Sequence, residues 1–410
     1  MNVLIISTHD QQGGAAIAAY RQLEALNKNR VAASMLTINK KSDNSNVTEV
    51  GNPLLNRGRF ITERGVIFIQ NGYSKKNLFD ISIANTGVSI TNHPAFKKAD
   101  VIHLHWINQG MLSVREIGKI VASSKKIVWT MHDMWPFTGI CHHARECGLF
   151  ATSCGVCPYL KNPSKGDLSQ SIYLQKQAAY SLGKIHFVAC SNWLKELAVK
   201  SPLTINHKVS AIANPIDIEQ YKPTDKTRVR KALNLPLNKK IILFAAAKVS
   251  DKRKGIDYLI EASKIIAQQK DNNCIFLIAG SNSEETLSQL ALPAISVGYV
   301  SSDEMHNLYN AANLFVTPSL QENLPNTIME SMACGTPCVG FNIGGIPEMI
   351  DHKENGYVAN YKDAQDLAHG LMWVLDEETE TLSEKARKKT VVHYSEAIIA
   401  KKYIDIYNKE

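Results

Sequence analysis

The sequence predicts an α/β protein built from two doubly wound, Rossmann-like domains. Its 410 residues exceed what one hydrophobic core usually supports, because single cores stop growing at about 250 to 300 residues. In both halves of the chain, short apolar runs typical of buried strands alternate with stretches of helical periodicity. Polar or glycine-containing turns follow several of these runs. This alternation predicts parallel sheets covered by helices, with ligands at the carboxyl ends of the strands.

The first domain is predicted to span residues 1–215. It opens with the apolar run 3–7, which has no basic leader before it and is therefore interpreted as a first strand. A turn with Gly13 and Gly14 follows, and then a helix that ends near Leu26. These glycines would let the backbone approach a phosphate or an acceptor, to which the helix adds its dipole; a plain tight turn is the alternative.

Two later strands of this domain, predicted at 100–106 and 126–133, end in histidines. Ligands of doubly wound sheets gather at the carboxyl ends of strands, so His132 stands where chemistry would take place. An imidazole there could hydrogen-bond a substrate. We interpret His103 and His105 as buried structural residues.

Four closely spaced cysteines follow His132: Cys141, Cys147, Cys154 and Cys157. We expect reduced thiols in a cytoplasmic chain, so a cluster of this kind favours a metal site over a disulfide framework. Four thiolates can complete the tetrahedral shell of a structural zinc. Because the first two spacings are irregular, reduced cysteines packed in a loop are the alternative.

The second domain is predicted at 216–392, and its range begins with the polar interdomain linker 218–228. Its first strand is expected at 239–249, and further strands at 274–281 and 294–305 continue the alternation of strands and helices.

The most informative stretch of this domain lies between residues 317 and 350. It contains Glu322 and Glu330, separated by seven residues, and then CGTP and GGIPE turns. Pro325 is predicted in the first turn of a helix over 326–333, where its missing N–H group costs nothing. The start of this helix would bind a diphosphate, and the two carboxylates would accept hydrogen bonds from a sugar and a ribose.

These motifs resemble those of retaining family-4 glycosyltransferases. HDMWPFTG with the cysteines after it is similar to the branch that builds bacterial exopolysaccharides of the colanic acid type. The resemblance implies a GT-B fold, with two facing Rossmann-like domains and an interdomain cleft. It also implies that a C-terminal helix at about 393–410 packs back on an acceptor-binding first domain, and that the second domain binds a nucleotide sugar.

The resemblance also implies roles for single residues. His132, in an HD motif, matches the catalytic-site histidine, and Lys254 matches a cation that grips the donor diphosphate, although a solvated lysine is the alternative. The arginine usual before this lysine is missing, so Lys248 or Arg253 would replace it. The expected catalytic residues are His132, Glu322 and Lys254. The expected donor-binding residues are Gly13, Gly14, Lys248, Arg253, Lys254, Tyr299, Glu322, Asn323, Leu324, Pro325, Asn326 and Glu330.

The function that follows is retaining transfer of a sugar from a UDP- or GDP-linked donor to a hydroxyl of a lipid-linked or growing cell-surface polysaccharide. We expect no cofactor to be required for catalysis, since no Asp-x-Asp motif signals a metal clamp. A nucleoside-diphosphate-sugar epimerase or phosphorylase of the same fold is the alternative. Front-face attack is expected by analogy with the family.

The net charge of +8 is uneven, with +12 up to residue 215 and −4 beyond it. A basic half suggests an anionic partner. Basic and apolar residues mix between 54 and 76, which suits a helix or loop on an anionic membrane surface; an ordinary core-facing helix is the alternative. A nucleic-acid-binding protein is the alternative from another class, but no basic stripe with aromatics supports it, and we expect no nucleic acid partner. We expect a cytoplasmic protein, associated with the inner face of the plasma membrane.

Overall fold

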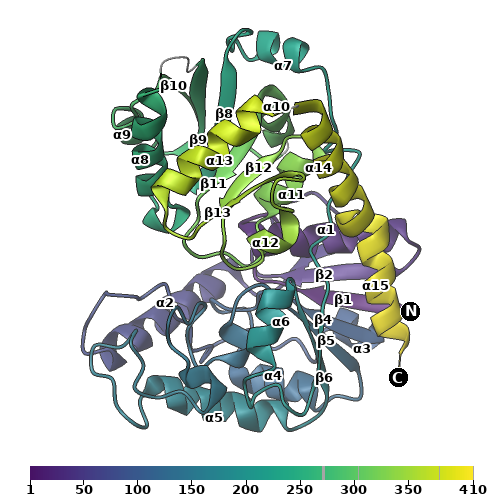
Figure 1. Ribbon diagram of the computed structural model, residues 1–410. Coiled ribbons are helices and arrows are strands. Elements are labelled where there is room, and N and C mark those ends of the chain that lie inside the picture. The colour runs from purple at the N-terminus through teal and green to yellow at the C-terminus, as the bar shows by residue number, and fades with distance from the viewer. Residues whose placement is uncertain (270–272, 303, 378, 410) are drawn as a thin grey trace. The chain divides into compact units, whose positions relative to one another are not determined.

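The computed structural model describes residues 1–269, 273–302, 304–377 and 379–409 (Figure 1). Glu410, the last residue of the expected C-terminal helix, lies outside them. The chain divides into two compact units, of which unit 1 comprises Met1–Pro215 and Ile399–Glu410 and unit 2 comprises Ile216–Ile398. Each unit contains its own parallel sheet.

Unit 1 is built on a seven-stranded parallel sheet with the order β3-β2-β1-β4-β5-β6-β7. Its strands are β1 (Asn2–Ile6), β2 (Ala32–Thr37), β3 (Val47–Glu49), β4 (Val101–Leu104), β5 (Lys126–Met131), β6 (Ile185–Ala189) and β7 (Lys208–Ala211). The order reverses between β1 and β4. Ligands of such sheets bind outside the carboxyl ends of the strands at this switch point.

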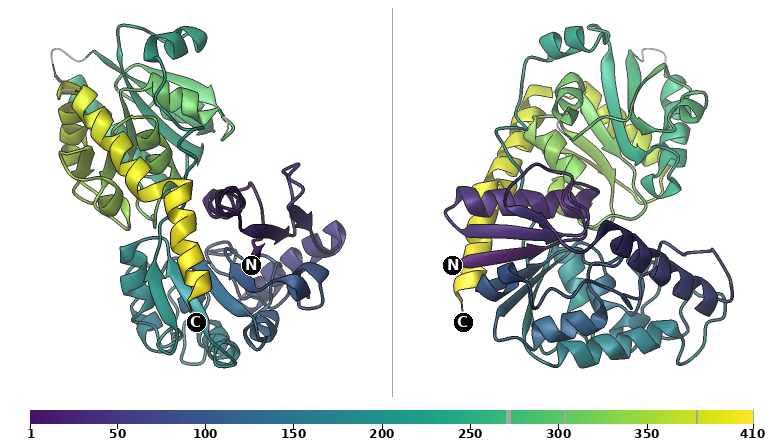
Figure 2. Two further views of the ribbon diagram at one scale, coloured as in Figure 1. Left: turned by 90° about the vertical axis from the view of Figure 1, so that its right-hand side faces the viewer. Right: turned by 180° about the vertical axis from the view of Figure 1, so that it is seen from behind.

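Both faces of the unit 1 sheet are buried, which explains why its strands are continuous apolar runs. Successive side chains of a strand point to opposite faces, so Leu4 and Ile6 belong to one core and Val3 and Ile5 to the other. Figure 2 shows helices on both sides of these strands.

Five helices of unit 1 begin at side-chain caps, where Asn52, His93, Ser113, Asp167 and Ser191 accept hydrogen bonds from first-turn N–H groups. The helices are α1 (Gly14–Lys28), α2 (Pro53–Gln70), α3 (Pro94–Lys98), α4 (Val114–Val121), α5 (Leu168–Tyr180) and α6 (Asn192–Ala198), with the 3-10 turns η1 (Trp135–Phe137) and η2 (Leu149–Ala151). From Ile399 onward, α15 (Glu396–Asn408) also belongs to unit 1, where Tyr403 lies in the second core.

Unit 2 repeats the same topology with six parallel strands in the order β10-β9-β8-β11-β12-β13. Its strands are β8 (Lys240–Lys248), β9 (Cys274–Ser281), β10 (Ala294–Gly298), β11 (Leu314–Thr317), β12 (Cys338–Phe341) and β13 (Gly356–Ala359). Its helices are α7 (Lys226–Ala232), η3 (Lys252–Lys254), α8 (Ile256–Ala267), α9 (Glu284–Leu287), α10 (Met305–Ala311), α11 (Asn326–Ala333), α12 (Ile346–Met349), α13 (Ala364–Asp376) and α14 (Thr379–Tyr394). The switch point lies between β8 and β11.

The predicted fold class of two doubly wound, Rossmann-like domains is confirmed. The strands expected at 239–249 and 274–281 are β8 and β9, and the helix expected at 326–333 is α11. One detail of that helix differs, because Pro325 is its N-cap, with φ −68° and ψ 120°, and Asn326 is the first helical residue. Within the described ranges, no helix is long and apolar enough to cross a membrane.

Candidate functional site

The switch point of unit 2 brings Lys254 and Glu322 together. They lie in the loops after β8 and β11, and Nζ of Lys254 forms an ion pair with Oε1 of Glu322. Gly255 allows this approach: it has a φ of +75°, and a Cβ there would lie 1.7 Å from the carbonyl oxygen of Pro318. The lysine side chain is 37% exposed. Since exposed ion pairs add little stability, this pair mainly fixes where the ammonium and the carboxylate point.

The loop before α11 is held from behind by the GGIPE turn. The N–H of Gly345 donates to the carbonyl of Asn323 at 2.7 Å. A Cβ on Gly344 would lie 1.9 Å from the carbonyl oxygen of Glu322, so this position needs glycine. Asn323, Leu324 and Pro325 are buried, and Pro325, the N-cap residue, supplies no side-chain hydrogen bond to the first turn of α11. A helix start of this kind can bind an anion through its backbone N–H groups.

Glu330 lies on α11 and is 6% exposed. Its Oε2 accepts a hydrogen bond from the hydroxyl of Tyr309 on α10 at 2.9 Å. Burial and the nearby Glu330 raise the pKa of Tyr309 well above its usual value, so the phenol remains a donor. The contact fixes the carboxylate of Glu330.

The other residues that were predicted to bind the donor, Arg253, Lys248 and Tyr299, differ in their surroundings. Arg253 is engaged by Asp251, with Nη2 to Oδ2 at 2.7 Å, and this hydrogen bond lowers the pKa of Asp251. Lys248 is exposed at the end of β8. Tyr299, after β10, is 74% exposed. Lys248 and Arg253 are the two candidates to replace the missing arginine. Arg253 would have to give up its contact with Asp251 in order to bind the donor.

The loop after β1 is firmly anchored at the switch point of unit 1. Thr8 donates to the carbonyls of Trp106 and Asn108 at 3.0 and 2.8 Å. Gly13 follows with a φ of +90° and is the N-cap of α1, while a Cβ there would meet nothing within 4 Å. Gly13 and Gly14 are both exposed. The glycine is thus required by the turn, and the space beside it is open.

His132 lies directly after β5, among buried polar groups. Its Nε2 is 3.0 Å from Nδ1 of His105, and the two rings stack with centroids 5.2 Å apart. Its Nδ1 is 3.5 Å from Sγ of Cys190, which donates to Asn214. Burial lowers the pKa of His132 to about 4. The imidazole is therefore neutral near pH 7 and can hydrogen-bond a substrate without carrying charge.

The expected burial of His103 and His105 is confirmed, since they are 0% and 3% exposed. His103 hydrogen-bonds Thr130 at 2.7 Å and the hydroxyl of Tyr407 at 2.6 Å. Burial lowers the pKa of His103 to about 3.

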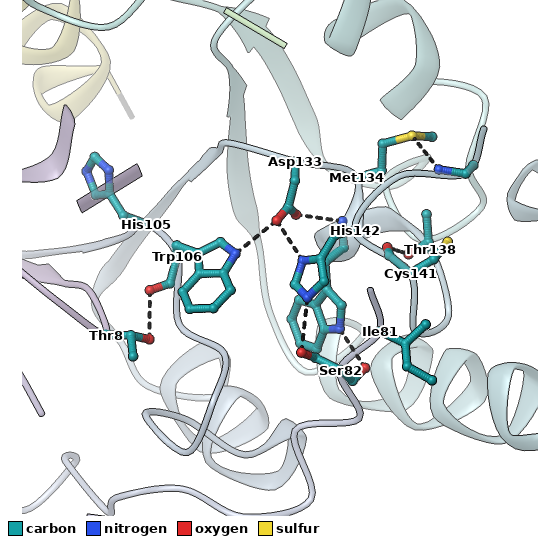
Figure 3. Close-up of polar contacts among 12 residues, drawn as sticks. Thr8, Ile81, Ser82, His105, Trp106, Asp133, Met134, Thr138, Cys141 and His142 are labelled. Carbon is teal, nitrogen blue, oxygen red and sulfur yellow. Dashed lines mark hydrogen bonds and ion pairs between the residues drawn. The ribbon is translucent and has the colours of Figure 1, made fainter. Parts of the chain in front are cut away.

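Asp133 is the centre of a hydrogen-bond network shown in Figure 3. Its carboxylate accepts from Trp106 Nε1 at 2.9 Å and contacts His142 Nδ1 at 2.7 Å, and His142 Nε2 is 3.0 Å from the hydroxyl of Ser82. Burial alone would raise the pKa of Asp133, but His142 lowers it to about 2. The order of contacts is that of a hydrolase triad. Ser82 is only 1% exposed and also accepts from Arg64, so the network holds the loop after β5 in place.

The four predicted zinc ligands line one small cavity in unit 1, together with Phe150, Tyr159 and neighbouring backbone. All four cysteines are free thiols. Burial raises the pKa of Cys141 to about 12 and that of Cys154 to about 11. In the part of the chain that the structure describes, no three His, Cys, Asp or Glu side chains are grouped so that they could hold a metal ion.

Three supporting residues escaped the sequence analysis: Tyr309, Cys190 and His142. Each is far in sequence from the residue it contacts or carries no motif of its own. Tyr309 and Glu330 lie on different helices, so no local pattern links them. His142 directly follows Cys141 in the sequence, but no motif predicts its contact with Asp133.

The chain is similar to known proteins over most of its length. The profile of the family Glycosyl transferases group 1 matches residues 225–390. The chain is 27% identical over 334 residues to an uncharacterized glycosyltransferase of Methanocaldococcus jannaschii, covering 76% of this chain and 83% of that protein. It is 25% identical over 223 residues to the UDP-Gal:alpha-D-GlcNAc-diphosphoundecaprenol alpha-1,3-galactosyltransferase of Escherichia coli, covering 52% and 57% of the two chains. It aligns with the structure of Anabaena HepE in complex with UDP-glucose at a TM-score of 0.64 and 16% identity, covering 99% of both chains.

The chain has two doubly wound units, each with a switch point where ligands of such sheets bind. Together with the likeness to the HepE structure, this defines a two-domain GT-B fold. The profile match and the relatives support a glycosyltransferase. They do not favour the epimerase or phosphorylase alternative.

Proposed function

We propose that the protein transfers a sugar, with retention of anomeric configuration, from a nucleoside-diphosphate sugar to a hydroxyl of a lipid-linked or growing cell-surface polysaccharide. The observation that carries this proposal is the ion pair of Lys254 with Glu322, which lies in the loop before the start of α11. HepE was solved with UDP-glucose, and the Escherichia coli relative is named for a UDP-linked donor and a diphosphoundecaprenol acceptor. A UDP-linked donor is the first candidate, with a GDP-linked donor as the second.

In unit 2, the donor diphosphate binds the N–H groups at the start of α11 and the ammonium of Lys254. Negative charge develops on the leaving diphosphate, and a cation fixed beside it stabilises that charge. Lys248 or Arg253 supplies the second positive charge. Glu322 accepts hydrogen bonds from the transferred sugar, and Glu330 accepts them from the ribose. The buried loop residues Asn323, Leu324 and Pro325, with Asn326 at the start of α11, shape this pocket, and the exposed Tyr299 lies beside the base.

Unit 1 supplies the acceptor side of the reaction. His132 contributes a neutral imidazole that hydrogen-bonds the transferred sugar or the acceptor hydroxyl. Such a bond requires a ring nitrogen that now contacts His105 or Cys190, so the ring exchanges one internal contact for the substrate. The turn at Gly13 and Gly14 would let its backbone approach the same substrates, and the space beside Gly13 is open.

The helix α2 favours a membrane surface as a further partner. Its polar residues Glu63 and Arg64 are buried, with Glu63 accepting two backbone hydrogen bonds at 2.8 Å, whereas Leu54 and Leu55 are 79% and 60% exposed. Of the apolar residues predicted there, Ile67 is buried in the core. An ordinary core-facing helix would instead bury its leucines and expose its charged residues to solvent. The α2 surface consists of the exposed residues Leu54, Leu55, Arg57, Ile61, Ile69, Tyr73, Lys75 and Lys76.

We propose that the α2 surface binds the anionic headgroups and upper acyl region of a bilayer. Its leucines and isoleucines would enter the interface, while Arg57, Lys75 and Lys76 would pair with lipid phosphates. This attachment would place the enzyme, on the cytoplasmic side, beside a lipid-linked acceptor.

The donor is tested by thermal unfolding with UDP, GDP and a panel of nucleotide sugars. We expect a clear rise of the melting temperature with one nucleoside diphosphate and a further change with its sugar conjugate. The matching donor is then incubated with lipid-linked oligosaccharide, and the anomeric configuration of the product is determined by NMR. Inversion would overturn the retaining assignment, and isomerised sugar without acceptor would identify an epimerase instead.

The α2 surface is tested by flotation with vesicles that contain phosphatidylglycerol. The double variant Leu54→Glu with Leu55→Glu should lose most of the binding. The control replaces two other exposed leucines of unit 1, Leu174 and Leu182, by Glu and should float like the parent. Equal flotation of both double variants would exclude the α2 surface as the lipid contact.

A further inference from the structure

The cavity in unit 1 that the four cysteines line has a volume of about 20 Å³. This is close to the space that one water molecule or one ion needs. Its remaining lining includes Ile140, Ala144, Leu149, Phe150 and Pro158. A water molecule needs two to four polar partners. Apart from the thiols, the polar side chains of the lining are Ser169 and Tyr159, whose hydroxyls already donate to Asp167 and to the carbonyl of His143. The chemistry of the cavity therefore suits a soft cation held by sulfur better than it suits water.

Two of the sulfur atoms receive backbone N–H groups. The N–H of Gly139 points to Sγ of Cys154 at 3.2 Å, and the N–H of Tyr159 to Sγ of Cys157. Backbone donors to sulfur stabilise thiolates, as they do around metal-bound cysteines. They also fix the direction in which these two side chains point.

The segment that carries the last two cysteines is strained. Cys154, Gly155 and Val156 have φ values of 56°, 95° and 50° in succession. A β-branched residue rarely adopts a positive φ, and each such non-glycine residue costs about 1 kcal/mol or more. Strain of this kind persists only where other interactions fix the conformation. In this loop the turn brings Cys154 and Cys157 to the same cavity.

Lys176 on α5 is a buried lysine close to the cysteines of the cavity. It is 0% exposed, and its Nζ donates to the carbonyls of Trp135 and Thr138 at 2.6 and 3.1 Å. No carboxylate among the described residues forms an ion pair with it. Cys154, Cys141 and the carboxylate of Asp133 lie within electrostatic range of Lys176, and burial lowers the pKa of Lys176 well below its usual value. A buried cation without a paired acid is costly, and a negatively charged tetrathiolate centre would compensate it.

We propose that Cys141, Cys147, Cys154 and Cys157 bind one zinc ion in this cavity. Binding converts four thiols to thiolates and releases four protons, so the resulting centre carries two negative charges beside Lys176. The sulfurs are not arranged as a closed shell in the structure. The side chains must therefore turn inward, and the half-buried Cys147 and Cys154 have the room to do so. The volume of the cavity suits a single ion.

The proposal is tested on the full chain, purified without chelator. We expect about one zinc per chain, released by a mercurial reagent that titrates thiols. Exchange for cobalt should produce the intense visible bands and the sulfur-to-cobalt charge-transfer band of a tetrahedral thiolate site. Cys154→Ser and Cys157→Ser should each lose most of the metal, whereas Cys274→Ser, a buried cysteine of β9, should keep it.

The cobalt spectrum is measured on the parent protein, so the test stands even if a cysteine variant fails to fold. Less than about a tenth of an equivalent of zinc after incubation with excess metal would overturn the proposal. So would disulfides between these cysteines in freshly purified protein, or a cobalt spectrum without sulfur bands. None of these outcomes bears on the donor site of unit 2, whose assignment is tested by nucleotide binding.

Discussion

At the scale of single residues, the two glutamates of the motif have different surroundings. Glu322 is held by an ammonium that a neighbouring loop supplies, whereas Glu330 is buried and held by a phenol. A carboxylate that is fixed before its ligand arrives loses little entropy on binding. This difference suits the proposed division of work, in which Glu330 binds the ribose and Glu322 acts next to the charge of Lys254.

Replacing Glu330 by Gln should weaken donor binding by roughly ten- to a hundredfold, because a hydrogen bond to a charged group is worth about 1.5 to 3 kcal/mol. The substitution keeps the size of the side chain and a partner for Tyr309. Donor affinity is measured by calorimetry with the nucleotide sugar identified above. The variant Glu354→Gln, an exposed acid of the same unit, serves as the control. An unchanged donor affinity of the Glu330 variant would contradict the ribose role.

Replacing His132 by Ala should lower kcat by roughly ten- to a hundredfold, the cost of one lost hydrogen bond in the reaction centre. Donor affinity should change much less, since the diphosphate contacts all belong to unit 2. His186→Ala, a change of another histidine in the same sheet, serves as the control. A His132 variant as fast as the parent would remove this residue from the reaction centre.

At the scale of elements, glycines fix the turns that carry the proposed donor site. Gly255→Ala should destabilise unit 2 strongly, because its Cβ would lie 1.7 Å from a carbonyl oxygen and its φ is +75°. Gly298→Ala is the matched control: its φ is +68°, but its Cβ would meet nothing within 4 Å. It should cost only about 1 to 2 kcal/mol from the left-handed backbone. Equal melting temperatures of the two variants would show that the loops after β8 and β11 can separate without cost.

The strands and the helix of the proposed donor site could be predicted because their signals are local. β9 is a continuous apolar run between polar segments, and α11 follows directly from Pro325 and its apolar spacing. The burial of charged residues on α2, together with the exposure of its leucines, could not be predicted in this way. Glu63 is buried because it accepts the backbone N–H groups of Ile83 and Ala84, and no periodic pattern announces a contact 20 residues away. Contacts of this kind depend on the tertiary fold.

At the scale of the whole molecule, several ionisable groups of unit 1 prefer their neutral form. Burial lowers the pKa of His103 to about 3 and that of His132 and His186 to about 4. The unfolded chain would titrate these histidines near about pH 6.5. Their contribution to stability is therefore complete above pH 6.5, and it is lost as the pH falls from there toward 4, where only the unfolded chain binds the protons.

Acid should therefore unfold unit 1 first. The free energy of unfolding should fall by up to about 1.4 kcal/mol per pH unit for each such histidine below about pH 6.5. Urea unfolding followed by tryptophan fluorescence reports this directly, since four of the five tryptophans lie in unit 1. His186→Gln should reduce by one the number of protons taken up on unfolding, so the free energy of unfolding should fall less steeply with falling pH. His393→Gln, which changes an exposed histidine of unit 2, should leave this slope unchanged. A stability that stays constant between about pH 7.5 and about pH 5 would show that these histidines accept protons in the folded protein.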